Sequence, residues 1–218
     1  NVSVSGGNFA SGEKSFGYFD ATGTSFPFQN GIVLSTGKIV NAQGPNTSLS
    51  DDGGNMGWNG DPDLNQALGL SNTFNATVLE FDFIPLGNRI SFDYIFSSEQ
   101  YLSNPSSNQC NFTDGFAFLL KRNGDISYQN LAVIPGTTTP VKVNTVRGPG
   151  TICPPANAAY FDAFNGTTHP TNFNGQTTVL TAQSDVIPGQ TYHIKLVIAD
   201  EGNYRYDSAI FLGGGSFN

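Results

Sequence analysis

The chain has 218 residues, of which 12% are charged and 12% aromatic, and its formal net charge is −8. A disordered chain would carry more charge and fewer aromatic residues, and a coiled coil would be rich in Ala, Glu, Lys and Leu. A nucleic-acid-binding protein would show a basic surface, and a membrane span needs about 18 consecutive apolar residues, longer than any apolar stretch here. The composition therefore predicts a compact, mostly β protein that neither binds nucleic acid nor inserts into a membrane.

Short apolar or alternating runs between turn residues predict strands along most of the chain. TVLEFDFI at Thr77–Ile84 and RISFDYIF at Arg89–Phe96 alternate with a period of two, which is typical of strands with one buried face. GFAFLL at Gly115–Leu120 is apolar on both faces, as expected of a central strand. Further strands are predicted at Ile32–Ser35, Leu131–Ile134, Val141–Val146, Thr177–Ala182, Thr191–Ile198 and Ser208–Leu212.

Helix signals are few. The segment Asp63–Leu70 has Asp63 as a candidate N-cap and apolar Leu64 and Leu68 four residues apart. Many short strands with frequent turns predict an all-β, single-domain β-sandwich of jelly-roll type over residues 1–218, with long loops and at most one or two short helices.

The two cysteines, Cys110 and Cys153, both lie in loops rich in Asn, Pro or Gly. Such loop cysteines in a Lys-poor chain favour an exported protein with one disulfide, and two free thiols are the alternative. The spacing fits no zinc motif. The chain begins without Met, as a mature fragment or an excised domain would.

The candidate catalytic residues form no recognisable motif. His169 lies in a loop before Pro170, and His193 lies within a predicted strand. No nucleophile elbow accompanies them. Glu80 and Glu99 could serve glycoside hydrolysis only if they faced each other across a cleft, which a sequence does not show. We therefore predict that the chain is not an enzyme.

Three loop segments concentrate oxygen-bearing side chains of the kind that calcium binds: Asp51–Asp63, Ser97–Gly115 and Ala199–Ala209. None matches the EF-hand pattern. The alternative for each segment is turn chemistry, because Asp and Asn side chains bind their own backbone in turns. Taken together, the segments predict at least one calcium ion as the cofactor.

Several long segments of the chain resemble the choice-of-anchor L domain family, a module of exported bacterial surface proteins. The resemblance covers most of the chain from residue 31 onward and implies no catalytic activity. It is carried by GIVLSTG (Gly31–Gly37), NAQGPN (Asn41–Asn46), GDPDLNQALG (Gly60–Gly69), VLEFDFIPLGNRISFDYIFSSEQY (Val78–Tyr101), DGFAFLL (Asp114–Leu120), NLAVIPGTTTPVKVNTV (Asn130–Val146), FNGQTTVLTA (Phe173–Ala182) and PGQTYHIKLVIADEGNYRYDSAIFLGGGSF (Pro188–Phe217).

The resemblance also marks positions for metal ligands. The acidic residues that match are Asp61, Asp63, Glu99, Asp114, Asp200 and Asp207, and we add Glu201 from the same loop. The family usually has Glu where Gln100 stands and often Asp where Asn203 stands, so a cation carried over to these positions would bind more weakly or with another ligand. Cys110 and Cys153 are not part of the family pattern, so a disulfide there would be a local addition.

The chain further resembles the calcium-dependent peptide-binding domain of repeats-in-toxin adhesins, which implies a peptide ligand with a free C-terminal carboxylate held partly by calcium. We therefore predict an extracellular, calcium-dependent module of a bacterial surface adhesin that binds a peptide or protein on another cell and is monomeric as an isolated domain. The expected ligand contacts are Trp58, Tyr101, Asn203 and Tyr204, with Trp58 the most exposed. A carbohydrate-binding module and a purely structural, calcium-stiffened domain are the alternatives.

Overall fold

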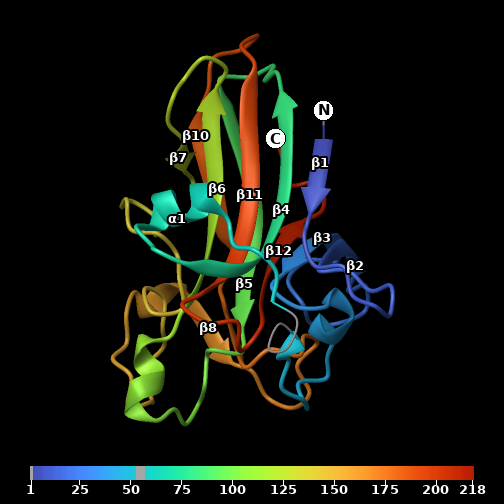
Figure 1. Ribbon diagram of the computed structural model, residues 1–218, viewed down its shortest axis with the longest axis vertical. Coiled ribbons are helices and arrows are strands. Elements are labelled where there is room, and N and C mark those ends of the chain that lie inside the picture. The colour runs from blue at the N-terminus through green and yellow to red at the C-terminus, as the bar shows by residue number, and fades with distance from the viewer. Residues whose placement is uncertain (1, 53–56) are drawn as a thin grey trace.

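The computed structural model describes residues 2–52 and 57–218, and these residues form an all-β sandwich of twelve strands in two antiparallel sheets (Figure 1). The first sheet has the order β1-β4-β11-β6-β7. Its strands are β1 (Val2–Ser5), β4 (Thr73–Phe83), β11 (Tyr192–Glu201), β6 (Asp114–Arg122) and β7 (Gln129–Asn130).

The second sheet has the order β2-β3-β12-β5-β9-β8, with β10 pairing with β5 as well. Its strands are β2 (Phe16–Asp20), β3 (Asn30–Ser35), β12 (Ser208–Gly213), β5 (Arg89–Ser98), β9 (Gly175–Thr177), β8 (Phe161–Phe164) and β10 (Leu180–Asp185). The helical elements of the described residues are α1 (Pro62–Leu68) and three 3-10 turns, η1 (Ile39–Ala42), η3 (Ser107–Asn111) and η4 (Ala158–Tyr160). The predicted fold class is confirmed.

The main core lies between the two sheets, because alternate residues of the long central strands face inward. Phe92 and Tyr94 of β5 each place their ring 4.9 Å from the ring of Phe118 on β6, and Phe96 lies 5.0 Å from Phe116. All five of these aromatic side chains are buried. The period-two alternation seen in the sequence is thus the alternation of a buried and an outer face.

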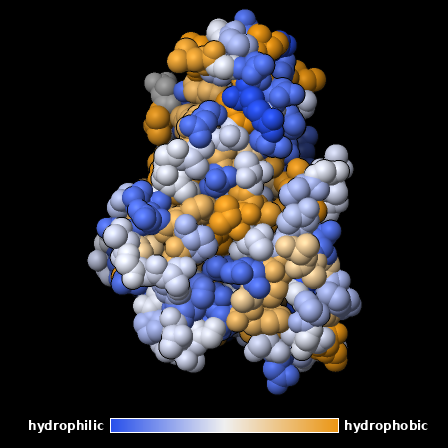
Figure 2. Space-filling model, turned by 180° about the vertical axis from the view of Figure 1, so that it is seen from behind, coloured by the Kyte–Doolittle hydropathy of each residue, from blue (hydrophilic) through white to orange (hydrophobic). Residues whose placement is uncertain are grey.

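Smaller apolar clusters cover the outer faces. Leu64 of α1 is fully buried against the outer face of the first sheet, together with Leu119 and Val197. On the second sheet, Val33 and Phe211 are covered by the loops that carry Phe26 and Phe173. Seen from behind, the molecule presents hydrophobic residues in separate areas bordered by hydrophilic ones (Figure 2).

The predicted helix differs from the observed one at both ends. Asp61, not Asp63, is the N-cap, and its carboxylate accepts a hydrogen bond from Leu64 N at 2.9 Å. Pro62 then occupies the first helical position, where its fixed φ and missing N–H are tolerated. The helix ends at Leu68 because Gly69 takes up a left-handed conformation at φ 67°. Within the described residues no helix is long and apolar enough to cross a bilayer.

Some predicted strands are wrong. Residues 131–134 and 141–146 do not form strands. Their β-pairing is limited to isolated bridges, such as the one between Val133 and Pro140. Leu131, Ile134 and Val141 are nonetheless buried in the main core, so their apolar pattern reflects burial and not sheet pairing.

The predicted strand Thr177–Ala182 is divided between β9 and β10, because Thr178 N turns aside to bond Tyr160 O at 2.9 Å. Strands β1, β2, β7 and β8 lie outside the predicted set. Strand β1 alternates Val and Ser, but it has only four residues and none of them is buried, so it lies at the edge of the first sheet without a face in the core.

Candidate functional site

Four strand ends bring four carboxylates together at one end of the sandwich. Strand β6 begins at Asp114, which lies opposite Asp200 at the end of β11. Glu99 follows the last residue of β5, and Asp207 precedes the first residue of β12; the Glu99 N–H donates to Asp207 O at 3.0 Å. We call these four residues the acidic end. Glu99 and Asp200 are 0% exposed, and Asp114 and Asp207 are 1% exposed.

Each carboxylate of the acidic end accepts at least one hydrogen bond. Ser208 Oγ donates to Asp114 Oδ2 at 2.5 Å, and Asn75 Nδ2 donates to Asp200 Oδ2 at 2.8 Å. Backbone N–H groups serve the other two, because Ser50 N donates to Glu99 Oε1 at 2.8 Å and Asp52 N donates to Asp207 Oδ2 at 3.0 Å. The cluster therefore ties the strand ends to the segment around Asp51.

Two oxygens of the cluster remain incompletely satisfied. Glu99 Oε2 and Asp200 Oδ1 are buried and accept no well-formed hydrogen bond from the described residues. The Asn174 N–H and the Thr36 hydroxyl lie close enough to favour the charged carboxylates, but outside normal hydrogen-bond geometry. Buried, incompletely bonded carboxylate oxygens are costly, so a further partner would stabilise them.

Burial and mutual repulsion disfavour negative charge at the acidic end. Burial, with a smaller contribution from the charge of Asp207, raises the pKa of Glu99 to about 7 and that of Asp114 to about 8. Burial, followed by repulsion from Asp114, also holds the pKa of Asp200 well above its ordinary value. In the described part of the chain, Glu99, Asp114 and Asp200 form no ion pair with Lys or Arg.

The remaining predicted metal ligands pair with lysines, although Glu201 directly follows Asp200 and its charge acts on Asp114. Lys195 Nζ lies 2.6 Å from Asp61 and 2.7 Å from Asp63, and Lys142 Nζ lies 2.6 Å from Glu201. Burial by itself would lower the pKa of Lys195, but the two neighbouring carboxylates raise it. Three of the seven predicted ligands therefore already have a cationic partner.

The seven predicted ligands do not all lie together, since Asp61, Asp63 and Glu201 pair with lysines and the other four form the acidic end. Across residues 2–52 and 57–218, no three Asp, Glu, His or Cys side chains are arranged as a metal-binding group.

The structure also assigns residues to the acidic end that the sequence did not reveal. Asn75 has a positive φ of 55°, which turns its side chain to meet both Asp200 and the backbone of Trp58. Gly37 is required by packing, because a Cβ there would lie 2.0 Å from Asp207 Oδ2. Gly37 is the last residue of the GIVLSTG segment. The sequence therefore contained this glycine as a signal of close packing, but it did not show that Asp207 is the residue packed against it.

Next to the acidic end lies a groove of about 600 Å3 that we call the Trp58 groove. It is lined by the aromatic side chains Trp58, Phe74 and Tyr204 and by Gly57, Asn59, Gly60 and Thr73. Asn75 joins the two features, since its Oδ1 accepts from Trp58 N at 2.9 Å while its Nδ2 donates to Asp200.

The predicted ligand contacts divide between this groove and the core. Tyr204 is 42% exposed and stands edge-on to Phe74 at 5.8 Å, and Asn203 beside it accepts from Arg205 N in a turn. Trp58 is half-buried, not the exposed residue expected, because its indole N–H donates to Ala76 O at 2.8 Å.

Tyr101 is a core residue and not a ligand contact. It is 0% exposed, and its hydroxyl donates to Val146 O at 2.8 Å. Although Tyr101 lies in the loop after β5, its side chain is covered by Val146 and by the ring of Phe161, which lies 5.0 Å away.

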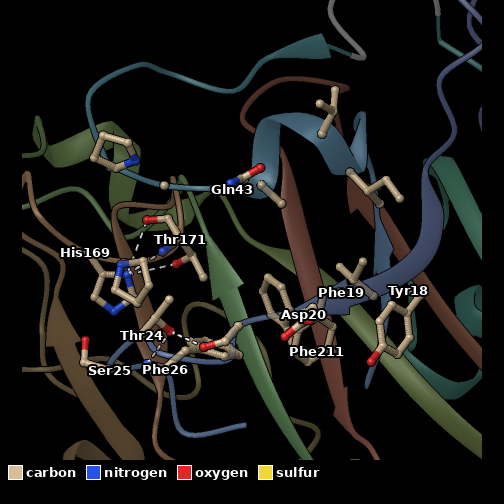
Figure 3. Close-up of a pocket in the computed structure, with 18 of the residues that line it drawn as sticks. Tyr18, Phe19, Asp20, Thr24, Ser25, Phe26, Gln43, His169, Thr171 and Phe211 are labelled. Atoms are coloured by element: carbon tan, nitrogen blue, oxygen red, sulfur yellow. Dashed lines mark hydrogen bonds between the residues drawn. The ribbon is translucent and has the colours of Figure 1, made fainter. Parts of the chain in front are cut away.

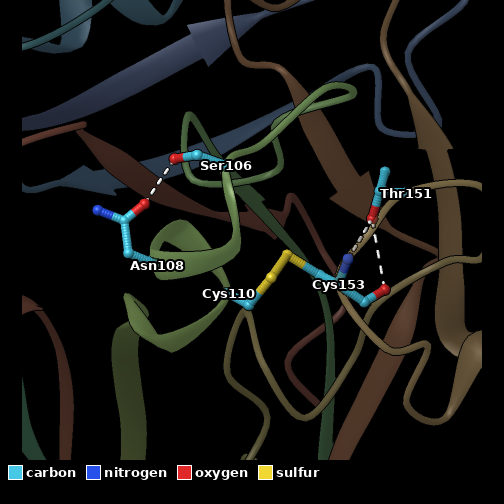
Figure 4. The surroundings of a disulfide bond; sticks show 5 residues. All are labelled: Ser106, Asn108, Cys110, Thr151 and Cys153. Carbon is cyan, nitrogen blue, oxygen red and sulfur yellow. Dashed lines mark hydrogen bonds between the residues drawn. A yellow bond between two sulfur atoms is a disulfide. The ribbon is translucent and has the colours of Figure 1, made fainter.

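The disulfide between Cys110 and Cys153 joins η3 to the loop that carries Thr151, across a sequence separation of 43 residues (Figure 4). Thr151 Oγ1 accepts from Cys153 N at 3.2 Å, which shapes the turn around the second cysteine. The predicted disulfide is confirmed, and its loop closes over β6 and β7 in the sequence.

The residues considered for catalysis lie apart. Glu80 lies on the outer face of the first sheet, where His193 Nε2 is 3.4 Å from its carboxylate, whereas Glu99 is buried at the acidic end. His193 is a strand residue of β11, and its Nδ1 is 2.8 Å from Asp82 Oδ1. His169 is a half-buried loop residue bound to Thr171.

In comparison with known proteins, the family model of the choice-of-anchor L domain matches residues 1–218. No curated protein and no solved structure matches the chain. The matched region includes every strand of both sheets and all four residues of the acidic end. The chain therefore belongs to the choice-of-anchor L domain family and is a cell-surface-associated module of a bacterial surface protein.

Proposed function

We propose that this module is a calcium-dependent, peptide-binding part of an extracellular adhesin, with calcium at the acidic end and the peptide in the Trp58 groove. One observation carries the proposal: within the described residues, Glu99, Asp114 and Asp200 are buried, pair with no Lys or Arg, and adjoin a groove lined by aromatic side chains. We also propose that the module acts without catalysis.

The chemistry of the acidic end supports calcium as the cation. All the side-chain donors there are oxygens, and calcium takes about six to eight oxygen ligands, including amide and backbone oxygens and water. A dication would stabilise the charged forms of Glu99, Asp114 and Asp200 that burial disfavours. Glu99 Oε2 and Asp200 Oδ1 are the oxygens with bonding capacity left.

Burial of the acidic end argues that the cation would act by ordering the groove and not by touching the ligand. Asp200 holds Asn75, and Asn75 holds the backbone of Trp58. Loss of the cation would increase the repulsion between Asp200 and Asp114, and would thereby weaken the two hydrogen bonds that connect Asp200, Asn75 and the backbone of Trp58. Direct capture of a peptide carboxylate by the ion would require the cover of the acidic end to open, so we leave it out of the proposal.

The groove offers what a peptide side chain needs. Trp58, Phe74 and Tyr204 supply apolar area with few rotatable bonds, and the backbone of Gly57 and Gly60 gives close access to main-chain polar groups. The half-buried Trp58 is held from below by Phe9, whose ring lies 5.7 Å away and edge-on. A fixed aromatic wall of this kind lowers the entropy cost of binding.

The experiment uses calcium chloride alone and then a library of short peptides, each with and without EDTA. We expect calcium to raise the melting temperature and a subset of peptides to bind by calorimetry only when calcium is present. Equal peptide binding with calcium and with EDTA would contradict calcium dependence. A calcium-induced rise in melting temperature without any peptide binding would instead favour a purely structural role, the second candidate, which the burial of the acidic end supports.

The variant Asp200→Asn tests the site itself. Asparagine cannot ionise, so the variant avoids the free-energy cost of burying an ionisable carboxyl group beside Asp114 and should be more stable than the wild type at pH 8 without calcium. The same variant should lose most of the calcium-induced rise in melting temperature. Asp185→Asn is the matched control, since Asp185 is an exposed aspartate at the end of β10 and should behave as the wild type. An unchanged calcium response in Asp200→Asn would reject the site.

A further inference from the structure

A second cavity lies on the outer face of the second sheet, and none of the residues that line it belongs to the acidic end or to the Trp58 groove. Its volume is about 680 Å3, and β2, the segment around η1 and the loop around His169 line it (Figure 3). Small-molecule sites commonly have volumes of about 300–1,000 Å3. We call this cavity the His169 pocket.

The walls of the His169 pocket are held by the fold. On one side Gln43 and Thr171 form an antiparallel bridge, and Gly44 N donates to Pro170 O at 2.9 Å. On the other side Phe19 and Phe26 pack edge-on against Phe211, with ring centres 5.3 Å and 5.0 Å away. The pocket is thus preformed, with an apolar floor that does not need to collapse or reorganise on binding.

His169 supplies a directed hydrogen-bond donor. Its Nδ1 accepts from the backbone N–H of Thr171 at 3.1 Å, and since a backbone N–H can only donate, the ring proton resides on Nε2. Burial lowers the pKa of His169, so the ring is neutral at physiological pH. Nε2–H has no partner among the described residues, and the ring stands across the cavity from Phe19 and Phe211 (Figure 3).

The charge and polarity of the lining define the ligand. Among the residues that the structure describes around the pocket, Asp20 is the one charged side chain, and no Lys or Arg is present. Carboxylate and phosphate ligands would therefore find no counter-charge. Gln43 and Ser25 add neutral donors and acceptors beside the aromatic floor. A neutral ring with hydroxyl groups on its edge and an apolar face suits this combination.

We propose that the His169 pocket binds a neutral sugar unit of a glycan, with the apolar face of the sugar on the phenylalanine floor and its hydroxyl groups on His169 Nε2 and the Gln43 amide. This goes beyond the peptide-binding function, because the residues that line the pocket include none of the acidic end and none of the Trp58 groove. Sugar binding is accordingly independent of calcium.

The test is a titration of the full chain with neutral monosaccharides (glucose, galactose, mannose, fucose and N-acetylglucosamine), followed by saturation-transfer NMR in the presence of EDTA. We expect at least one sugar to bind. Gln43→Ala should weaken it about three- to tenfold, the effect of one hydrogen bond. Gln190→Ala is the matched control, an exposed glutamine in the turn before β11, and should leave binding unchanged.

A second variant blocks the cavity without burying a new residue in the core. Ser25 lines the pocket and is exposed, so Ser25→Trp should fold normally and abolish binding. The proposal is overturned if no sugar of the panel binds at millimolar concentration, or if binding survives Ser25→Trp. It is also overturned if EDTA removes binding, or if an uncharged phenylalanine peptide competes for the pocket while the sugars do not. None of these results bears on peptide binding in the Trp58 groove.

Discussion

Tyr101 and Tyr204 lie in similar polar loops of the sequence, yet the fold gives them opposite environments. Tyr101 is 0% exposed and bonded to Val146 O, whereas Tyr204 is 42% exposed at the edge of the Trp58 groove. The sequence around Tyr101 continues from a strand with a buried aromatic face, which is the one local signal for its burial. Whether a loop aromatic faces solvent depends on which other segments cover it.

The hydroxyl of Tyr101 provides a test at the residue scale. Tyr101→Phe removes the donor to Val146 O and leaves that buried carbonyl without its partner, which should lower the free energy of unfolding by about 1–2 kcal/mol. Urea denaturation measures the change. Tyr18→Phe removes the same atom from a side chain that is 68% exposed and should have no measurable effect. Equal losses in the two variants would show that the buried bond is not what stabilises Tyr101.

At the scale of elements, α1 is joined to the first sheet by charge as well as by apolar contact. Lys195 on β11 lies beneath the N-terminus of the helix and meets the carboxylates of Asp61 and Asp63. Asp61 has a second role as N-cap, which explains why an acidic residue that resembles a calcium ligand in the sequence does not need a metal. The DPD sequence contains the signal for this cap, because Pro is favoured at the position that follows it.

The two carboxylates should therefore differ in their effect on stability. Asp61→Ala removes the helix cap and half of the pairing of a buried lysine, and should cost about 2–3 kcal/mol. Asp63→Ala should cost less than about 1 kcal/mol, because the Asp63 side chain is 37% exposed. Thermal denaturation followed by circular dichroism compares them. If Asp63→Ala were the more harmful of the two, the capping role of Asp61 would be wrong.

Whether an apolar segment becomes a strand also depends on the rest of the fold. The long strands β4, β5, β6 and β11 follow from alternation or from continuous apolar sequence, because each has at least one face in the core. Residues 131–134 and 141–146 carry an equally apolar sequence without becoming strands, since β7 takes the edge position of the first sheet. Apolar content thus predicts burial more reliably than it predicts hydrogen-bond pairing.

At the scale of the whole molecule, the acidic end links stability to pH. The folded pKa values of Glu99 (about 7) and Asp114 (about 8) lie above the unfolded values of about 4. Between these limits the folded protein holds more protons than the unfolded chain, so the free energy of unfolding must fall as the pH rises. This contribution is fully present below about pH 4 and is lost as the pH passes the folded pKa values.

Without calcium, we therefore expect the free energy of unfolding to fall between pH 5 and pH 8, by up to about 1.4 kcal/mol per pH unit for each proton retained. Calcium favours the deprotonated carboxylates, so saturation with calcium should reverse or remove this fall. Denaturation across this pH range, with EDTA or with calcium chloride, measures both curves. Stability in EDTA that rose steadily to pH 8 would contradict the protonated state of the acidic end.

The sequence by itself determined the fold class, the family and the residues with the right chemistry, because period-two alternation, turn residues and long family segments are local properties. It did not determine which carboxylates meet. Glu99, Asp114, Asp200 and Asp207 lie together only because four strand ends from two sheets coincide, while Asp61, Asp63 and Glu201 are directed to lysines. Strand register and sheet packing bring residues from distant parts of the chain side by side, so burial, ion pairing and the His169 pocket were decided by the tertiary structure alone.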